Sequence, residues 1–67
     1  MCLSTVYDQN KNKLCENIMM MNQLEDGRLD FINLMGVRTS VYGSIEKINL
    51  MDNYIYVKKE PGKEPVK

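Results

Sequence analysis

The stretch Asn22–Phe31 (NQLEDGRLDF) is the strongest folding signal in the chain. Its Asp26-Gly27 pair is typical of a two-residue type I′ turn, in which both central residues adopt positive φ. Such a turn places apolar residues and opposite charges directly across from each other in an antiparallel pair. The predicted cross-strand pairs are Glu25–Arg28, Leu24–Leu29 and Asn22–Phe31. This stretch therefore predicts a β-hairpin with a defined register.

A second hairpin is predicted at residues 47–58 (KINLMDNYIYVK), with its turn at Asp52-Asn53. That turn puts four apolar residues on one face as the pairs Leu50–Ile55 and Ile48–Val57. Tyr54 and Tyr56 then lie on the opposite face. Between the two hairpins, the alternating stretch 37–45 loses one residue of phase before Ile48. A β-bulge or bend near Gly43 would absorb that shift.

The remaining segments add strands at residues 2–7 and 15–24, separated by a polar loop at 8–13. The fold predicted is all-β, a small antiparallel barrel or half-open sandwich of about five strands. Residues 1–60 are expected to form a single domain. Residues 61–67 contain two prolines and are expected to form a disordered polar tail.

The chain has 67 residues, so its core is small and self-association as a homodimer is expected. Neither a signal peptide nor an apolar run long enough to span a bilayer is evident, which predicts a cytoplasmic protein with reduced thiols. With no histidine and no nucleophile–base pair at an informative spacing, an enzyme is not expected. Nine basic and nine acidic residues give a net charge of zero, which offers no electrostatic reason to bind nucleic acid or anionic lipid.

Two cysteines and six methionines carry the remaining chemistry. Cys2 is either a small buried residue on the first strand or a metal ligand, and local sequence alone leaves both interpretations open. Cys15 is expected to be structural, with a thiol pKa raised by the neighbouring Glu16. The methionines, including the Met19–Met21 run, are interpreted as pliable core residues rather than ligands of a soft metal.

The start MCLSTVY, the turn at EDG, the FINLMG segment and YGSIEKINLMDNYIYV together resemble the CooT family of small nickel-binding proteins. The resemblance covers roughly residues 1–57. It implies a cytosolic homodimer of small β-barrels that binds Ni(II) with Cys2 as a ligand. It also implies an accessory role for a nickel enzyme such as carbon monoxide dehydrogenase.

Nickel chemistry is consistent with that implication, because Ni(II) suits square-planar sites of nitrogen and thiolate donors. One thiolate per chain is too few, and a two-fold axis near the N-terminus would bring two copies of Cys2 together. Main-chain nitrogens are the natural remaining donors. The alternative function is RNA binding by a small β-barrel, through Tyr54, Tyr56 and the nearby Lys47, Lys58 and Lys59.

Overall fold

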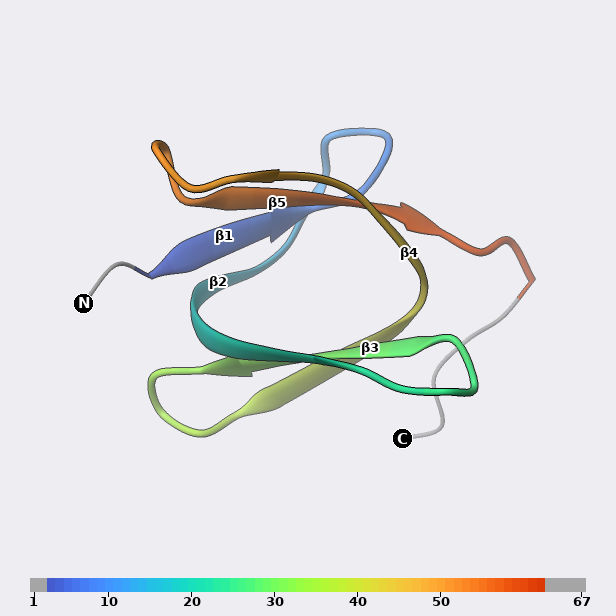
Figure 1. Cartoon of the computed structure of the whole chain (residues 1–67), viewed down its shortest axis with the longest axis horizontal. Coiled ribbons are helices and arrows are strands. Elements are labelled where there is room, and N and C mark those ends of the chain that lie inside the picture. Colours follow the sequence, from blue (N-terminus) through green and yellow to red (C-terminus); the bar gives the residue numbers. More distant parts are fainter. Residues whose placement is uncertain (1–2, 63–67) are drawn as a thin grey trace.

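The computed structural model describes residues 3–62, which form a closed five-stranded β-barrel (Figure 1). The strands follow one another around the ring in chain order: β1 (Ser4–Tyr7), β2 (Lys13–Gln23), β3 (Arg28–Asn33), β4 (Arg38–Asn49) and β5 (Tyr54–Lys59). Consecutive strands are antiparallel, so the fifth strand runs in the same direction as the first. The pairing of β1 with β5 that closes the ring is therefore parallel. The predicted all-β barrel is confirmed, and it is closed rather than half-open.

A compact apolar core fills the barrel. Its seven buried hydrophobic residues come from all five strands: Val6, Ile18, Leu29, Phe31, Val41, Ile55 and Val57. Leu29 and Phe31 alternate with Asp30 along β3, as expected for a strand with one face turned to the interior. Four partly buried residues complete the core: Leu14, Cys15, Met21 and Ile45. The closed ring also leaves no unpaired strand edge between β1 and β5.

The β2–β3 hairpin exists, but its predicted register was wrong by one residue. Gln23, rather than Leu24, lies opposite Leu29, and Met21 lies opposite Phe31. The turn is a three-residue loop in which the Gly27 N–H donates to the Leu24 carbonyl oxygen (3.2 Å), and Gly27 alone has a positive φ (89°). A type I turn followed by a left-handed glycine replaces the two-residue type I′ turn. The observed register brings Met21 against the core, which the predicted one did not.

The β4–β5 hairpin was also predicted correctly in kind and wrongly in register. Ile48 lies opposite Ile55 and Asn49 opposite Tyr54, a shift of two residues from the predicted pairs. The connection is a four-residue loop, 50–53, because the Asn49 side chain bonds to the loop backbone. Its Oδ1 accepts a hydrogen bond from the Asp52 N–H (2.9 Å), and Asn53 closes the loop with a positive φ of 57°. Leu50 consequently lies in the loop rather than on the inner face.

The predicted bulge in β4 is confirmed. The register shifts between Ile45, which faces Val57, and Lys47, which faces Tyr56, so Glu46 is the extra residue. Gly43 lies just before this bulge, where β4 bends across the barrel (Figure 1). A Cβ at this position would clash with the carbonyl oxygen of Lys58 on β5. Glycine is required here by the close approach of the two backbones.

Two further predictions concern the chain ends. Strand β5 ends at Lys59, and a turn follows at residues 61–62. The rest of the predicted disordered tail, residues 63–67, lies outside the described residues, as does Cys2, so the tail and the domain limits stay predictions. Within residues 3–62, no helix is long and apolar enough to cross a membrane.

Replacing Gly43 with alanine should destabilise the barrel more than replacing Gly36 with alanine. The added methyl of Gly43→Ala must displace the β5 backbone, at a cost of about 3 kcal/mol. Gly36 has open space around it but a φ of 83°, so Gly36→Ala should cost only about 1–2 kcal/mol. Urea unfolding of the two variants measures both values. A Gly43→Ala protein as stable as the Gly36→Ala protein would contradict the close approach.

Candidate functional site

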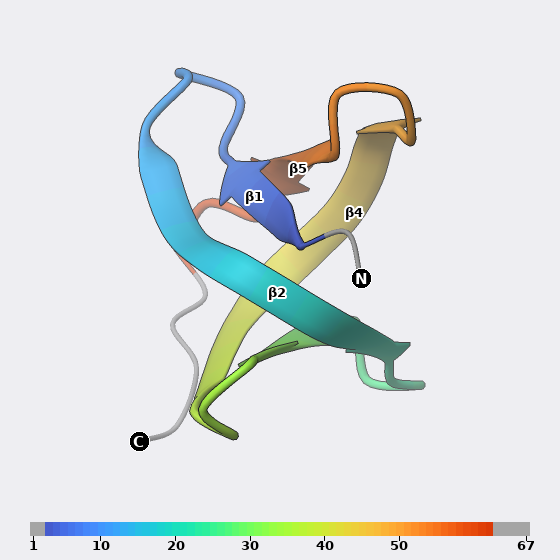
Figure 2. The ribbon, with the colours of Figure 1, turned by 90° about the vertical axis from the view of Figure 1, so that its left-hand side faces the viewer.

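One end of the long axis of the barrel gathers four segments that are distant in sequence. These are the beginning of β1, the middle of β2, the loop 34–37 and the loop 50–53 (Figure 1). Ser4 pairs with Ile18 of β2, and the Leu34 N–H donates to the carbonyl oxygen of Asn17 (2.9 Å). The Thr5 N–H donates to the carbonyl oxygen of Asn53 (3.0 Å). Figure 2 looks onto this end, with the beginning of β1 between the two loops.

This end carries the large exposed hydrophobic residues of the described chain, and we call it the apolar end. Its members are Met19, Met20, Leu34, Met35, Val37, Ile48, Leu50 and Met51. The most exposed are Met51 at 91 %, Leu50 at 82 % and Met35 at 79 % of their full surface. Several exposed apolar side chains at one end of a small protein are a candidate interaction surface, whereas single scattered hydrophobic residues are normal.

Side-chain hydrogen bonds hold the two loops of the apolar end in shape. Asn33 Oδ1 accepts from the N–H groups of Met35 and Val37, both at 2.9 Å, and Gly36 supplies a positive φ within that loop. Asn49 plays the same part in the loop 50–53 through its bond to the Asp52 N–H. The exposed apolar side chains are therefore displayed by organised turns, which lowers the entropy cost of docking a partner on them.

Cys2, the predicted metal ligand, lies outside the described residues, so its position stays untested. The described chain resumes at Leu3, and β1 begins at Ser4, within the apolar end. Among residues 3–62, no three His, Cys, Asp or Glu side chains come together as a group that could hold a metal ion. The donors proposed from the sequence, the Cys2 thiolate and main-chain nitrogens near it, belong to the segment before Leu3.

Cys15 behaves as the structural residue predicted from the sequence, for a different physical reason. Its thiol is half-buried and packs against the core. Burial raises the pKa of the Cys15 thiol to about 11, and a hydrogen bond with Thr39 only partly offsets this effect. Removal of the thiolate from water is the cause, rather than the neighbouring Glu16. At neutral pH, Cys15 is therefore protonated and a poor nucleophile or ligand.

The methionines divide into two groups, which the sequence interpretation did not separate. Met21 packs against the core as expected. Met19, Met20, Met35 and Met51 are exposed, so the interpretation of these four as core residues was wrong. Met35 and Met51 lie in loops, whereas the exposure of Met19 and Met20 arises in β2, where Asn17 has a positive φ and the register shifts between Ile18 and Met20. That irregularity ends the simple alternation and leaves two successive methionines facing solvent.

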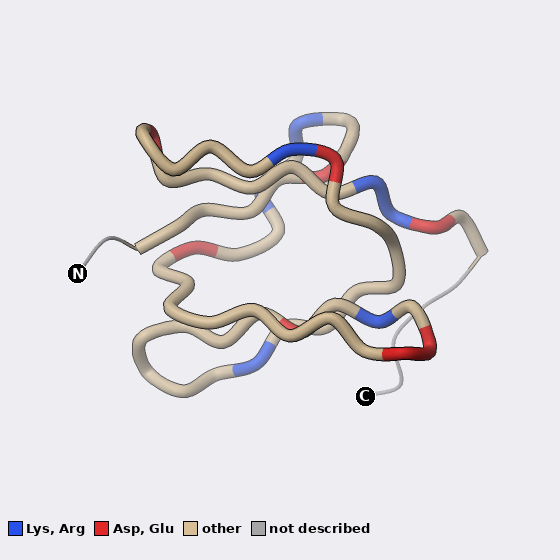
Figure 3. The backbone as a smooth tube through the Cα atoms, viewed as in Figure 1, with Lys and Arg blue, Asp and Glu red and all other residues tan. Residues whose placement is uncertain are grey.

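The tyrosine face predicted on β5 is present on the outside of the barrel. Tyr7 on β1 packs on Tyr56 with ring centroids 5.6 Å apart, and Tyr56 packs on Tyr54 at 4.9 Å. The Lys47 Nζ lies 5.8 Å from the Tyr54 ring centroid. Strand β5 is paired on both sides, so these rings do not lie on an edge strand. The backbone around these rings carries both basic and acidic residues (Figure 3).

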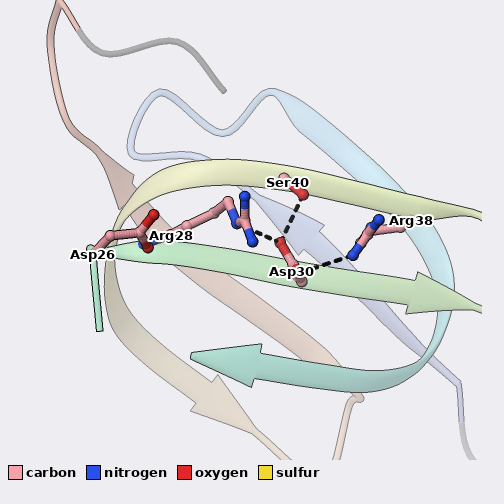
Figure 4. A network of polar contacts seen from close by, with 5 residues as sticks. All are labelled: Asp26, Arg28, Asp30, Arg38 and Ser40. Atoms are coloured by element: carbon pink, nitrogen blue, oxygen red, sulfur yellow. Dashed lines mark hydrogen bonds and ion pairs between the residues drawn. The ribbon is translucent and has the colours of Figure 1, made fainter. Parts of the chain in front are cut away.

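A buried ionic cluster on β3 and β4 was not found by sequence reasoning, which placed the acidic residues mostly in loops or solvated faces. Asp30 is 4 % exposed and accepts a hydrogen bond from Ser40 Oγ at 2.7 Å (Figure 4). Its carboxylate lies 3.2 Å from Arg28 Nε and 3.6 Å from Arg38 Nη1. The Nε–H group of Arg28 makes no hydrogen bond, so its contact with Asp30 is an ion pair only. The cluster joins the adjacent strands β3 and β4.

Asp8 is the second acidic residue that the structure buries, at 6 % exposure. Its Oδ1 accepts hydrogen bonds from the backbone N–H groups of Asn12 (2.9 Å) and Asn10 (2.8 Å). The Asn12 N–H is the largest of the effects that hold the pKa of the Asp8 carboxyl below its ordinary value. Its hydrogen-bond donors in the described chain belong to the loop before β2, so Asp8 shapes that loop.

Alkylation of Cys15 in the folded protein should be slow and strongly pH-dependent. With a pKa of about 11, only about one thiol in 1,000 is ionised at pH 8, and the fraction rises about tenfold per pH unit below the pKa. Iodoacetamide labelling followed by peptide mass spectrometry measures this rate between pH 7.5 and pH 10. Protein unfolded in urea is the control, because its thiols should titrate near pH 8.5. A native rate equal to the unfolded rate at pH 8 would contradict the burial.

The family model described as CO dehydrogenase accessory protein CooT matches residues 1–58, which include Cys2, strands β1 to β4 and all of β5 except its last residue, Lys59. No curated protein and no solved structure matches the chain. The matched range is most of the 67-residue chain. The chain therefore belongs to the CooT family of carbon monoxide dehydrogenase accessory proteins.

Proposed function

We propose that this protein is a cytoplasmic nickel-binding accessory protein that works as a homodimer, with Ni(II) held between the Cys2 thiolates of its two subunits. The observation that carries the proposal is the position of β1. The strand that follows Cys2 begins in the apolar end, where an apolar surface is available for a second subunit. Family membership supports the accessory role, and a nickel enzyme such as carbon monoxide dehydrogenase is the proposed client.

The thiolate and main-chain nitrogen donors near the N-terminus fit nickel better than a metal that needs several side-chain ligands already held together. The chain has no histidine, so imidazole does not compete for the ion. The Cys2 amide nitrogen and its own thiolate can form one chelate ring if the amide deprotonates, and the terminal amine is one residue away if Met1 remains. Two such segments supply the four nitrogen and sulfur donors that square-planar Ni(II) prefers. Cys15 adds nothing to this set, because its thiol is half-buried and protonated at neutral pH.

The apolar end is the proposed dimer interface. Seven buried hydrophobic residues make a small core, and covering eight further apolar side chains would stabilise a chain of this size. In a two-fold interface the same surface is used on both subunits, so any segment near its centre meets its own copy. The beginning of β1 lies between the two loops of this surface (Figure 2). Pairing through the apolar end would therefore bring the two N-terminal segments together.

The alternative of RNA binding through the tyrosine face is less well supported. The three tyrosine rings pack on one another, and Lys47 lies over Tyr54, so these groups already have partners within the barrel. Stacking platforms for single-stranded nucleic acid are usually combined with a positively charged groove. Here, the net charge is zero and the charges are interspersed.

Nickel titration of purified protein should give a thiolate-to-nickel absorption band that saturates at one Ni(II) per two chains. Cys2→Ser should abolish the band and weaken nickel binding by about 100-fold or more. Removing a residue that binds the metal directly weakens metal binding more than removing a residue that only orients a ligand. Cys15→Ser is the matched control and should keep both the band and the stoichiometry. A band that survives in Cys2→Ser but disappears in Cys15→Ser would reverse the assignment.

Leu50→Glu should convert the dimer into a monomer without unfolding the barrel. Leu50 is 82 % exposed in the single chain, so its replacement costs little folding free energy. A pair of unpaired carboxylates buried in the interface should raise the dimer dissociation constant by about 100-fold. Ser44→Glu, at an exposed position near the bend of β4, is the control and should remain dimeric. Sedimentation velocity measures both, and a dimeric Leu50→Glu protein would exclude this surface.

A further inference from the structure

We propose that the exposed methionines of the apolar end are oxidation sites, and that a hydroperoxide oxidant converts them to methionine sulfoxide and so dissociates the dimer. The sites are Met19, Met20, Met35 and Met51, with Met35 and Met51 the principal ones. This inference rests on the proposed function only in its use of the apolar end as the dimer interface. It adds regulation of the dimer by oxidants, and nickel binding does not require this regulation.

The placement of these thioethers is the first observation. Each of the four exposed methionines lies in the apolar end, while Met21, the remaining methionine of the described chain, packs against the core. Met35 is 79 % exposed and Met51 is 91 % exposed, each in one of the two loops that border this surface. Because thioethers accept oxygen according to their exposure, a peroxide should reach Met35 and Met51 first and Met21 last.

The chemical step is a two-electron oxygen transfer. The thioether sulfur attacks the distal oxygen of the hydroperoxide, the O–O bond breaks and an S–O bond forms. Sulfur is oxidised to the sulfoxide, and the peroxide is reduced to water, or to an alcohol when it is an organic hydroperoxide. Methionine sulfoxide reductases reverse the product with a thiol reductant, so the modification is reversible.

Three backbone N–H groups of the two loops would not be available as hydrogen-bond donors to a sulfoxide, because each already has a partner. The N–H groups of Met35 and Val37 both donate to Asn33 Oδ1. In the second loop, the Asp52 N–H donates to Asn49 Oδ1. The nearby backbone donors that hold the two loops are thus already used, and burying a strong acceptor without a partner is unfavourable. Oxidation of Met35 and Met51 should raise the dimer dissociation constant on the order of 100-fold.

The same geometry makes the reaction selective for the monomer. Met35 and Met51 are exposed in the single chain and would be covered by the second subunit in the dimer. Their oxidation should therefore slow as protein concentration rises above the dimer dissociation constant. Modified monomers are then removed from the equilibrium, because they cannot form the interface again until they are reduced.

The test compares wild-type protein with the variant Met19→Leu/Met20→Leu/Met35→Leu/Met51→Leu, which keeps apolar side chains of similar size and cannot be oxidised at the apolar end. Both are treated with hydrogen peroxide and then with dithiothreitol, which reverses disulfides and sulfenic acids but leaves sulfoxides. Intact and peptide mass spectrometry count the added oxygens. Sedimentation velocity then gives the dissociation constant of each.

Peroxide treatment should raise the dimer dissociation constant of the wild-type protein by about 100-fold, so that dimers become monomers. Treatment with methionine sulfoxide reductase should restore the dimer. The leucine variant should stay dimeric throughout. The reductase arm needs only the wild-type chain, so the test holds even if the variant folds poorly. A wild-type dimer that survives full oxidation of Met35 and Met51 would overturn this inference and leave the proposed dimer intact. Wild-type protein that is monomeric before oxidation would overturn the proposed interface itself.

Discussion

The parallel pairing between β1 and β5 is the constraint on which the rest of the molecule depends. Thr5, Val6 and Tyr7 are matched to Tyr54, Ile55 and Tyr56, and this one contact turns a curved sheet of five strands into a closed ring. Parallel strands in adjacent positions must begin at the same end of the barrel. The beginning of β1 is therefore placed beside the loop 50–53, although about fifty residues separate them in sequence. The position of the strand that follows Cys2 is thus a result of how the barrel closes.

Closure of the barrel also explains why some apolar residues are buried and others are exposed. A ring of five short strands has room inside for a small number of side chains, and the described core contains seven buried ones. The other large apolar residues of the apolar end have no interior position to occupy. Loops held by Asn33 and Asn49 display them together at one end instead of scattering them.

Much of the fold could be predicted from sequence, because alternation and turn residues identify strands locally. The existence of both hairpins, the bulge before Ile48 and the outward position of Tyr54 and Tyr56 all followed from period-two patterns. The strand registers could not be predicted in this way, because Gly27 and Asn49 create loops longer than the two-residue turns that the sequence suggests. The buried Asp30 was missed because its burial comes from arginines on β3 and β4. No local pattern shows such a contact, and none shows that distant methionines share one end.

The position of the first strand has a practical consequence for handling the protein. An affinity tag or fusion partner attached before Met1 would extend the segment that enters β1, within the surface where a second subunit would dock, and would bury or replace the terminal amine. Strand β5 ends at Lys59, at the opposite end of the barrel from the apolar end (Figure 1). A fusion at the C-terminus leaves the apolar end and the native amine free. Recombinant material with an N-terminal extension would therefore be a poor guide to the oligomeric state and metal content of the natural chain.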